Sequence, residues 1–575
     1  MIFKAFAHII PLSLGASVVT GTLYDGLNDN INYRSPFENL VEHGHSLDRI
    51  HGILSKRSAL GNPSFAFTHN VASGDPYHDS VILWTRAEPV EEKLGSVCVK
   101  YLVSKDEDFK TIVARGKAIT TADVDWTVKV EARGLKPLTN YYYKFHSCYD
   151  KKAESPVGRT KTMPRPDQKI DKSLRFAVYS CSNYPFGYFN AYGIPARTDS
   201  MDYIIHLGDY IYEYAGNGDY GDGAKIGRIP KPEKVITSLD DYRLRYATYR
   251  ADPDLALAHQ KFPWIVIWDD HEVADNTWKK GSANQNDTLL GVWFDKRKSS
   301  AEQAYFEWMP IRQVNRNDQR QIFRTFQIGD MADLIMLDTR NYERDITDMY
   351  YNTKWIEAIA EDPTRSLMGH HQEQWFYREL YKSKRRNAHW RLIGQQVEFN
   401  RLDYSAAIAG KIMNSDAWDG YRAARWRFFD FIKNHDIQNN IVLAGDVHSN
   451  WAWDLVDERN FKKYDIKTGE GAWGAAFTGT AVTSPSPYRS QNSTTRGKLE
   501  KTLVASNPAL KWVESTYRGY YTLTLDYDAI QAVYWGVEEI TTRNDKQIQL
   551  AQFKINHGEN HLSRPFNVTA GGVEN

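Results

Sequence analysis

Four short apolar segments of this 575-residue chain each end in residues that can bind metal ions. Short apolar runs bounded by turn residues are typical of buried strands, and open α/β sheets place their ligand sites just past the carboxyl ends of such strands. The residues that follow the four segments are Cys181; Asp209 and Tyr212; Asp270 and His271; and Asp446 and His448. A turn-forming Asp after one strand would mean little. Because four strand ends carry ligand residues, we predict a polynuclear metal site.

The ligand types indicate which metals this site would hold. Cys181 and Tyr212 would bind as a thiolate and a phenolate, and both need a strong Lewis acid to deprotonate near neutral pH, since Tyr titrates near about 10. Ferric iron accepts both kinds of ligand. The carboxylate and amide oxygens of Asp270 and Asn276 suit a harder ion such as calcium. The sequence therefore predicts iron together with calcium.

The strands that must position these ligands begin at residue 174. Six apolar runs alternate with helical segments from there on, which favours an α/β layered domain. The runs cover residues 174–179, 203–207, 264–268, 334–337, 392–393 and 441–444. Helical segments such as 299–308 and 372–380 are expected to cover the sheet faces.

Residues 58–163 precede this region and predict a small all-β domain. Alternating runs at 80–85, 126–130 and 141–145 are separated by turn residues, and the last of them is similar to a late strand of a fibronectin type III-like sandwich. Cys98 and Cys148 would lie on the outer face of two strands, either as a disulfide, which we favour, or as two unpaired thiols. The third cysteine, Cys181, is left without a partner.

The first residues are typical of an export signal. The apolar stretch within residues 1–21 is shorter than the ~20 residues that span a bilayer, so a signal peptide is favoured over a membrane anchor. Residues 22–57 end in Lys56-Arg57 and form either a pro-segment that is cleaved there or a solvated linker. Asn-x-Ser/Thr sequons at Asn286, Asn492 and Asn567 suit a secreted glycoprotein, in the medium, a cell wall or a vacuole.

The overall composition excludes some partners. The 72 basic residues balance the 72 acidic ones, so no net charge draws the chain to nucleic acid or to an anionic membrane. We expect no nucleic-acid partner and, because nothing after the first residues is similar to a transmembrane helix, no integral membrane segment.

Beyond these patterns, the chain resembles the PhoD-type alkaline phosphatases of the metallophosphoesterase group. The matching motifs are Val71–Pro76 with Leu83–Arg86, Ser180–Asn183, His206–Glu213, Trp268–Val273, Leu337–Arg340 and Gly445–Trp451. This resemblance implies a four-layer αββα catalytic domain, residues 164–555, behind the N-terminal β-sandwich, with residues 556–575 as a tail. It also implies hydrolysis of phosphate monoesters and diesters at alkaline pH, with a ferric ion and two calcium ions as cofactors.

The same resemblance implies a role for each ligand. Cys181, Asp209 and Tyr212 would hold the iron, with Asp209 as a bridge. A second set, consisting of Asp446, His448 and the region of Asp270 and Asn276, would complete the cluster. Members of the family carry an Asn pair where this chain has Asp275-Asn276, which leaves the oxygen ligand at that place open.

The mechanism that we infer is in-line attack by a metal-bound hydroxide or oxide, without a covalent protein intermediate. His271 is the candidate to orient the substrate or to protonate the leaving group, or else it supports a ligand structurally. Arg340 either contacts the phosphate or is a buried arginine paired with Asp338. His206 is expected behind the ligands, and His370-His371 is expected to be structural.

Three functions follow from these features. The first is a secreted phosphatase that releases phosphate from monoesters, and also from diesters, for phosphate scavenging. The second is a phosphodiesterase or phospholipase D-like enzyme that acts on a phospholipid or a polymer. The third is a secreted binding module with structural metals, which the intact ligand set disfavours because a structural site has no need of an open coordination position.

Overall fold

The structure is a computed structural model, and it describes residues 30–34, 64–90, 95–150, 152–218, 221–315, 318 and 320–573. The predicted signal peptide, the Lys56-Arg57 site and most of the predicted pro-segment lie outside the described residues. Within the part of the chain that is described, no helix combines the length and the apolarity that crossing a bilayer requires.

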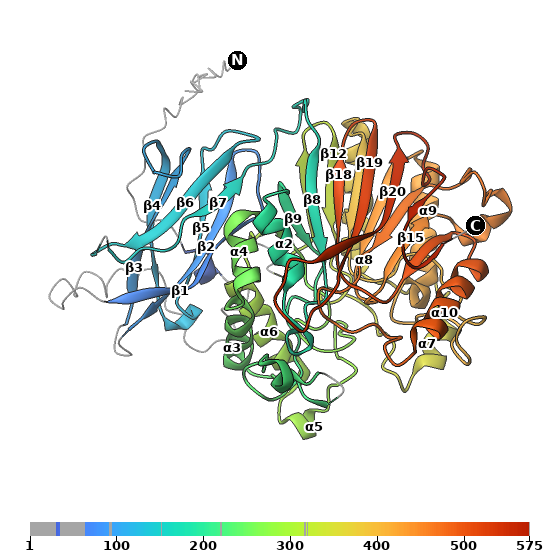
Figure 1. Cartoon of the computed structure of the whole chain (residues 1–575), viewed down its shortest axis with the longest axis horizontal. Coiled ribbons are helices and arrows are strands. Elements are labelled where there is room, and N and C mark those ends of the chain that lie inside the picture. Colours follow the sequence, from blue (N-terminus) through green and yellow to red (C-terminus); the bar gives the residue numbers. More distant parts are fainter. Residues whose placement is uncertain are drawn as a thin grey trace, which may run out of the picture.

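Two large sheets form the centre of the molecule (Figure 1). The ten-stranded sheet has the order β21 (Asn567–Val568), β20 (Gln547–Asn556), β19 (Ala529–Val537), β18 (Arg518–Leu525), β8 (Leu174–Tyr179), β9 (Tyr203–His206), β10 (Pro263–Val266), β1 (Phe65–Gly74), β2 (Ser80–Pro89) and β5 (Thr127–Arg133). The eight-stranded sheet has the order β11 (Arg324–Ile328), β12 (Ala332–Met336), β13 (Trp390–Gly394), β14 (Asn440–Ala444), β16 (Gly474–Thr478), β15 (Asn450–Asp454), β17 (Leu510–Glu514) and β22 (Gly572–Val573). All six apolar runs of the catalytic region are strands of these two sheets, as predicted.

Helices cover the outer faces of both sheets, so the layers are α, β, β and α. Alternate residues of β12–β14 separate the two cores: Leu334 and Leu392 pack with the ten-stranded sheet, whereas Ile335 and Ile393 pack with helices α8 (His370–Arg385) and α9 (Arg422–Asn434). The opposite face of the ten-stranded sheet packs against α2 (Asn190–Thr198), α3 (Leu239–Arg250), α4 (Pro253–Lys261) and α6 (Phe294–Trp308). Strands that are buried on both faces are apolar throughout, which is why these segments lack the alternation of a half-exposed strand.

The N-terminal β-rich region is joined to the central sheet by backbone pairing. Its strands β4 (Ile112–Thr120), β3 (Val97–Ser104), β6 (Asn140–Ser147) and β7 (Gly158–Lys161) form a separate sheet, at the blue end of Figure 1. In contrast, β1, β2 and β5 extend the ten-stranded sheet, with Gly74 of β1 opposite Trp264 of β10. A Cβ atom at Gly74 would lie 2.4 Å from the carbonyl oxygen of Pro310, so only glycine allows this close approach.

The cysteines are distributed as predicted. Cys98 and Cys148 form a disulfide with a Cα–Cα distance of 5.4 Å, which links β3 to the end of β6. Cys181 is buried and free. The disulfide therefore belongs to the N-terminal region, and the free thiol belongs to the catalytic region.

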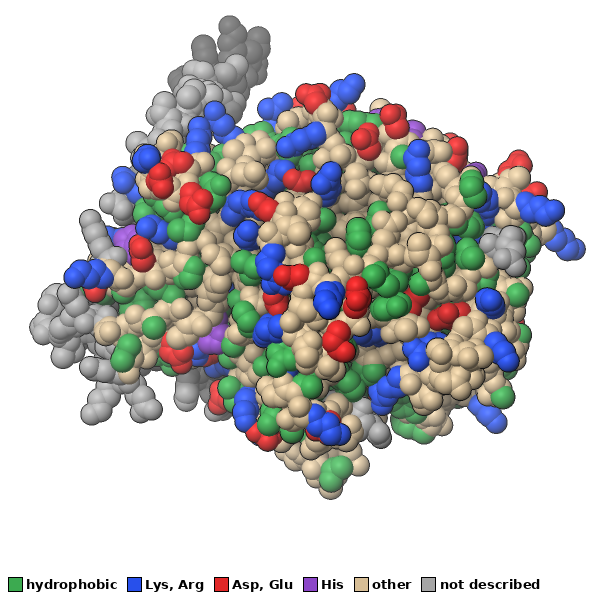
Figure 2. Space-filling view, viewed as in Figure 1, with side chains coloured by type: hydrophobic (Ala, Val, Ile, Leu, Met, Phe, Trp, Pro, Cys, Tyr) green, Lys and Arg blue, Asp and Glu red, His purple; other side chains and the backbone are tan. Residues whose placement is uncertain are grey.

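The C-terminal residues pair with both sheets. β21 lies beside β20 in the ten-stranded sheet, and β22 lies beside β17 in the eight-stranded sheet. On the face shown in Figure 2, acidic and basic side chains are interspersed, in keeping with the balanced charge of the sequence.

Candidate active site

The predicted ligand residues converge at one end of the two sheets, where they follow the carboxyl ends of β8, β9, β10 and β14. Five of them have positive φ angles: Cys181 at 61°, Asp209 at 55°, Asn276 at 50°, Asp446 at 66° and His448 at 50°. A residue other than glycine in this region costs free energy, and such residues cluster at functional sites where the surrounding structure holds them. The backbone therefore turns sharply just after β8, β9 and β14, and each turn directs a candidate ligand side chain to the same place.

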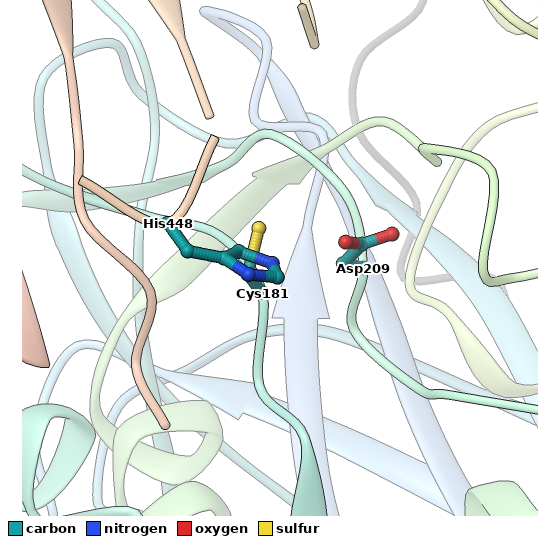
Figure 3. Close-up of side chains that lie close together, drawn as sticks. All are labelled: Cys181, Asp209 and His448. Carbon is teal, nitrogen blue, oxygen red and sulfur yellow. The ribbon is translucent and has the colours of Figure 1, made fainter. Parts of the chain in front are cut away.

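The ligand atoms form three overlapping groups, within each of which they lie within 4.8 Å of one another. Cys181, Asp209 and His448 form the first group (Figure 3). The second group contains Asp209, Asp270 and His271, and the third contains Asp269, Asp270 and Asp446. Asp209 and Asp270 each belong to two groups, so this arrangement suits adjacent metal ions that share carboxylates.

Tyr212 belongs with the first group. Its hydroxyl donates to Asp209 Oδ2 at 2.8 Å, lies 3.1 Å from His448 Nε2 and accepts a hydrogen bond from Ser484 Oγ at 2.7 Å. The His448 ring is fixed from its other side, because Nδ1 lies 3.0 Å from the carbonyl oxygen of Pro485. The phenol, the imidazole and the carboxylate thus share one small volume beside the Cys181 thiol.

The site concentrates more negative charge than the protein itself neutralises. Burial raises the pKa of Asp209 and Asp269 well above the usual range and that of Asp446 to about 6. Burial and the neighbouring Asp209 carboxylate also raise the pKa of Cys181 and Tyr212.

Two buried oxygens of this cluster, Asp269 Oδ2 and Asp270 Oδ1, accept no hydrogen bond. Buried carboxylate oxygens are costly without such partners or a cation. A set of thiol, phenol, imidazole and carboxylate donors with orphaned oxygens fits bound metal cations.

Arg340 is fully buried beneath the ligands rather than exposed to the cavity. Its guanidinium donates hydrogen bonds to Asp269, to Asp416 at 2.5 Å and to Asp446 at 2.5 Å, and it lies 3.8 Å from a fourth carboxylate, that of Asp270. Only the backbone N–H of Arg340 contacts Asp338, at 2.9 Å from Oδ1. The sequence suggested either a phosphate contact or a pair with Asp338, but the structure uses the guanidinium to hold three other carboxylates.

Arg340 also explains why Asp270 differs from its neighbours. Burial alone would raise the pKa of Asp270, but the charges of Arg340 and His271 outweigh this effect and hold it below the usual range. Asp270 Oδ2 accepts a hydrogen bond from the backbone N–H of Asn276 at 2.6 Å. That backbone contact places Asn276 beside Asp270, while its side-chain amide donates to the carbonyl oxygen of Asp348 at 2.7 Å.

His271 lies at the boundary between the ligands and the solvent-accessible cavity. Its Nδ1 is 2.7 Å from Glu213 Oε2, and its ring stacks on Tyr212 with centroids 4.2 Å apart. Burial would lower the pKa of His271, but the carboxylates of Glu213 and Asp270 raise it well above the usual value. With Nδ1 held by Glu213, Nε2 is the ring nitrogen left to act on a substrate.

The other histidines have supporting positions. His206 is buried, and its Nε2 lies 2.8 Å from the Tyr192 hydroxyl. Its Nδ1 accepts a hydrogen bond from the backbone N–H of Gly208 at 3.2 Å. It therefore stabilises the turn that presents Asp209. His370 and His371 begin α8, and Nδ1 of His371 lies 3.0 Å from the Tyr342 hydroxyl.

Several residues of the site were not predicted as participants. Asp416 and Ser484 lie in long loops without the strand that marked the other ligands, so no local pattern distinguishes them. Glu272 could have been found, because it stands inside the Trp268–Val273 motif. Its carboxylate accepts the N–H groups of Asp209, Tyr210 and Asp269 at 3.0, 2.6 and 2.8 Å, and so ties the ends of β9 and β10 together.

A cavity of 640 Å³ opens above this cluster. Candidate ligand residues and His271 line it together with residues from the loops that follow β8, β12, β13 and β16. The lining includes Tyr212, His271, Asp275, Asp446, His448, Tyr350, Tyr404, Lys411, Tyr488 and Arg489. The volume lies within the ~300–1,000 Å³ of pockets that enclose small-molecule ligands.

Two stacked sheets between helices, with Asp, His, Cys and Tyr converging at the strand ends, define a metallophosphoesterase fold. Family models agree with this: the PhoD-like phosphatase model matches residues 176–534, and the model of the PhoD-like phosphatase N-terminal domain matches residues 55–164. The chain belongs to the PhoD-like phosphatase family, and is thus a hydrolase of the phosphatase class that acts on phosphate esters.

Individual relatives support the same assignment. The chain is 36% identical to alkaline phosphatase D of Bacillus subtilis over 532 residues, which cover 91% of this chain and 86% of that protein. A solved structure of PhoD, 35% identical, superposes with a TM-score of 0.75 over 90% of this chain and 95% of that one. Purple acid phosphatase PPD1 from yellow lupin, only 11% identical, shares the fold with a TM-score of 0.51 over 86% of this chain and 75% of its own.

Proposed function

We propose that the chain is a secreted, metal-dependent phosphatase that hydrolyses phosphate monoesters and diesters for phosphate scavenging. The observation that carries this proposal is the convergence of a thiol, a phenol, an imidazole and four carboxylates at the floor of a cavity large enough for a whole ester. With metal cations bound by these donors, such a site would neutralise the charge of a dianionic phosphoryl group.

The donor types support ferric iron and calcium as the cofactors. Cys181, Asp209, Tyr212 and His448 would hold the iron, since thiolate and phenolate ligands need a strong Lewis acid. Asp270, Asp446 and the side chain of Asn276 would contribute oxygen ligands to calcium. When bound, these metal ions would lower the pKa of water and neutralise charge on the phosphoryl oxygens.

The protein side chains have separate tasks in this reaction. His271 orients the ester and donates a proton to the leaving oxygen through Nε2, while Glu213 fixes the ring through Nδ1. Glu213 is itself held, since it accepts hydrogen bonds from the Asp275 N–H and from Asn284 Nδ2, both at 2.8 Å. Arg340 keeps three carboxylates in place without touching the substrate.

Secretion is supported by three further features. The disulfide between Cys98 and Cys148 requires an oxidising compartment. The sequon residues Asn286, Asn492 and Asn567 are all exposed, as glycosylation requires. Together with the signal-like first residues, these features favour the secretory pathway.

The preference between monoesters and diesters can be tested with a matched pair of substrates. We expect an aryl phosphate monoester to be hydrolysed faster than the corresponding aryl phosphate diester by the full chain with calcium present. A ratio of rates well below one would replace the scavenging monoesterase with a phosphodiesterase. No rate on either ester, from protein shown to contain its metals, would contradict the proposed enzyme altogether.

A further inference from the structure

Lys411 contributes a positive charge to the cavity wall that the catalytic cluster does not use. The residue belongs to the long loop between β13 and the 3-10 helix at Trp418–Tyr421, and its side chain is exposed at the cavity. The Lys411 ammonium lies 4.3 Å from the centroid of the Tyr404 ring. Among the described residues, Lys411 has no ion-pair partner. A cation held by an aromatic face keeps its full charge for a ligand.

The buried arginines near the cluster already pair with other protein groups. Arg340 and Arg344 are fully buried, and both pair with Asp416. Arg518 is buried as well, and it donates to the carbonyl oxygens of His448 and Ser484 at 2.9 and 2.6 Å. Apart from His271, the cationic side chains that line the cavity are Lys411 and Arg489.

These two cations stand on connected loops. The side chains of Tyr404 and Tyr488 hydrogen-bond to each other, which joins the loop that carries Lys411 to the loop that carries Arg489. Arg489 follows Tyr488 directly and lies 5.8 Å from the centroid of the Phe186 ring. Phe186 also lines the cavity, so Arg489 lies against the segment that follows Cys181.

Lys411 lies in the same cavity as the candidate metal ligands. It lines this cavity together with Asp446, His448 and His271, and among the described residues it forms no ion pair with the carboxylates there. The metal ligands and His271 serve the reacting phosphoryl group. A cavity of 640 Å³ leaves room beyond that group for the leaving group of the ester.

We infer that Lys411 forms a subsite for a second anionic group on the leaving group, in the cavity that Arg489 also lines. The preferred substrates are then phosphate esters whose alcohol carries another negative charge, such as a carboxylate or a second phosphate. This inference rests on the proposed phosphatase function and adds the substrate class to it. Lys411 is a specificity-determining residue in this account, because it contacts the part of the substrate that leaves.

The test compares 4-carboxyphenyl phosphate with its methyl ester, which differs by one negative charge on the leaving group. For the wild-type full chain and for Lys411→Gln, kcat/KM is measured on both substrates. We expect the selectivity ratio, acid over methyl ester, to fall about tenfold in Lys411→Gln, the size of one charge pair near a protein surface. The two phenols differ in acidity, and this difference affects the rates of wild type and variant equally. It therefore cancels when the selectivity ratios of the two proteins are compared.

Two controls separate the possible outcomes. Lys411→Arg keeps the charge and should restore most of the ratio, and raised salt should shrink the ratio in wild type but not in Lys411→Gln. Lys462→Gln, at an exposed lysine that is not among the cavity residues, should change neither rate. An unchanged ratio in Lys411→Gln, or an equal fall on both substrates, would overturn the subsite. A wild-type chain that hydrolyses neither substrate would instead overturn the proposed function.

Discussion

Asp209→Asn is expected to lower kcat/KM for an aryl phosphate monoester by about 10²–10³-fold or more, and to lower the metal content of the purified protein. The carboxylate of Asp209 belongs to two of the three ligand groups, and it also accepts a hydrogen bond from the Tyr212 hydroxyl. Asparagine has the same shape but lacks the negative charge, so the adjacent cations lose a shared ligand. Kinetics and elemental analysis on the same preparation measure both effects.

A matched control shows whether the loss is specific to the site. Asp167→Asn removes a carboxylate whose side chain is 82% exposed, and it should leave both activity and metal content unchanged. The thermal midpoint of Asp209→Asn, measured beside wild type, reports whether the variant is folded. Nearly normal turnover by Asp209→Asn with a full complement of metal would show that Asp209 is not a ligand.

Arg340→Gln is expected to destabilise the metal-free protein by about 3–5 kcal/mol, as is typical when one partner of a buried charge pair is removed. The change leaves Asp269, Asp416 and Asp446 together in a buried site without their shared cation. Urea unfolding of chelator-treated wild type and variant measures the effect. In Arg340→Lys we expect an intermediate loss, because an ammonium keeps the charge but cannot match the fork of the guanidinium.

This prediction distinguishes the buried role of Arg340 from a substrate contact. Arg165→Gln, at a side chain that is 56% exposed, is the control and should have little effect on unfolding. If Arg340 bound phosphate, its replacement would raise KM while leaving the unfolding midpoint unchanged. That combination would refute the positioning role.

The convergence of the candidate ligands could be predicted from the sequence because most of them stand next to a local signal. Asp209 and Asp446 follow a short apolar strand and a glycine, and that pattern marks both the strand and the turn. The pairing of Cys98 with Cys148 was also accessible, since strand alternation placed both thiols on one face. Local patterns were sufficient wherever candidate ligands directly follow a short apolar strand.

Other features depend on contacts between distant segments and had no such signal. The backbone pairing of β1 with β10 joins residues that are about 190 positions apart, so the N-terminal region appeared separate in the sequence although its strands extend the central sheet. The partners of Arg340 come from three different loops, and Asp416 follows no strand at all. The identity of a buried ion pair is decided by the tertiary structure, which a sequence pattern does not contain.

The central claim, an iron and calcium centre built on Cys181, is tested most directly by elemental analysis of the purified, active full chain. We expect iron and calcium to be retained after gel filtration, and removal of both by chelation to abolish hydrolysis of an aryl phosphate monoester until they are restored. Cys181→Ser should lose iron while keeping the disulfide between Cys98 and Cys148, which lies in another part of the fold. Full activity in protein that contains neither iron nor calcium would contradict the account.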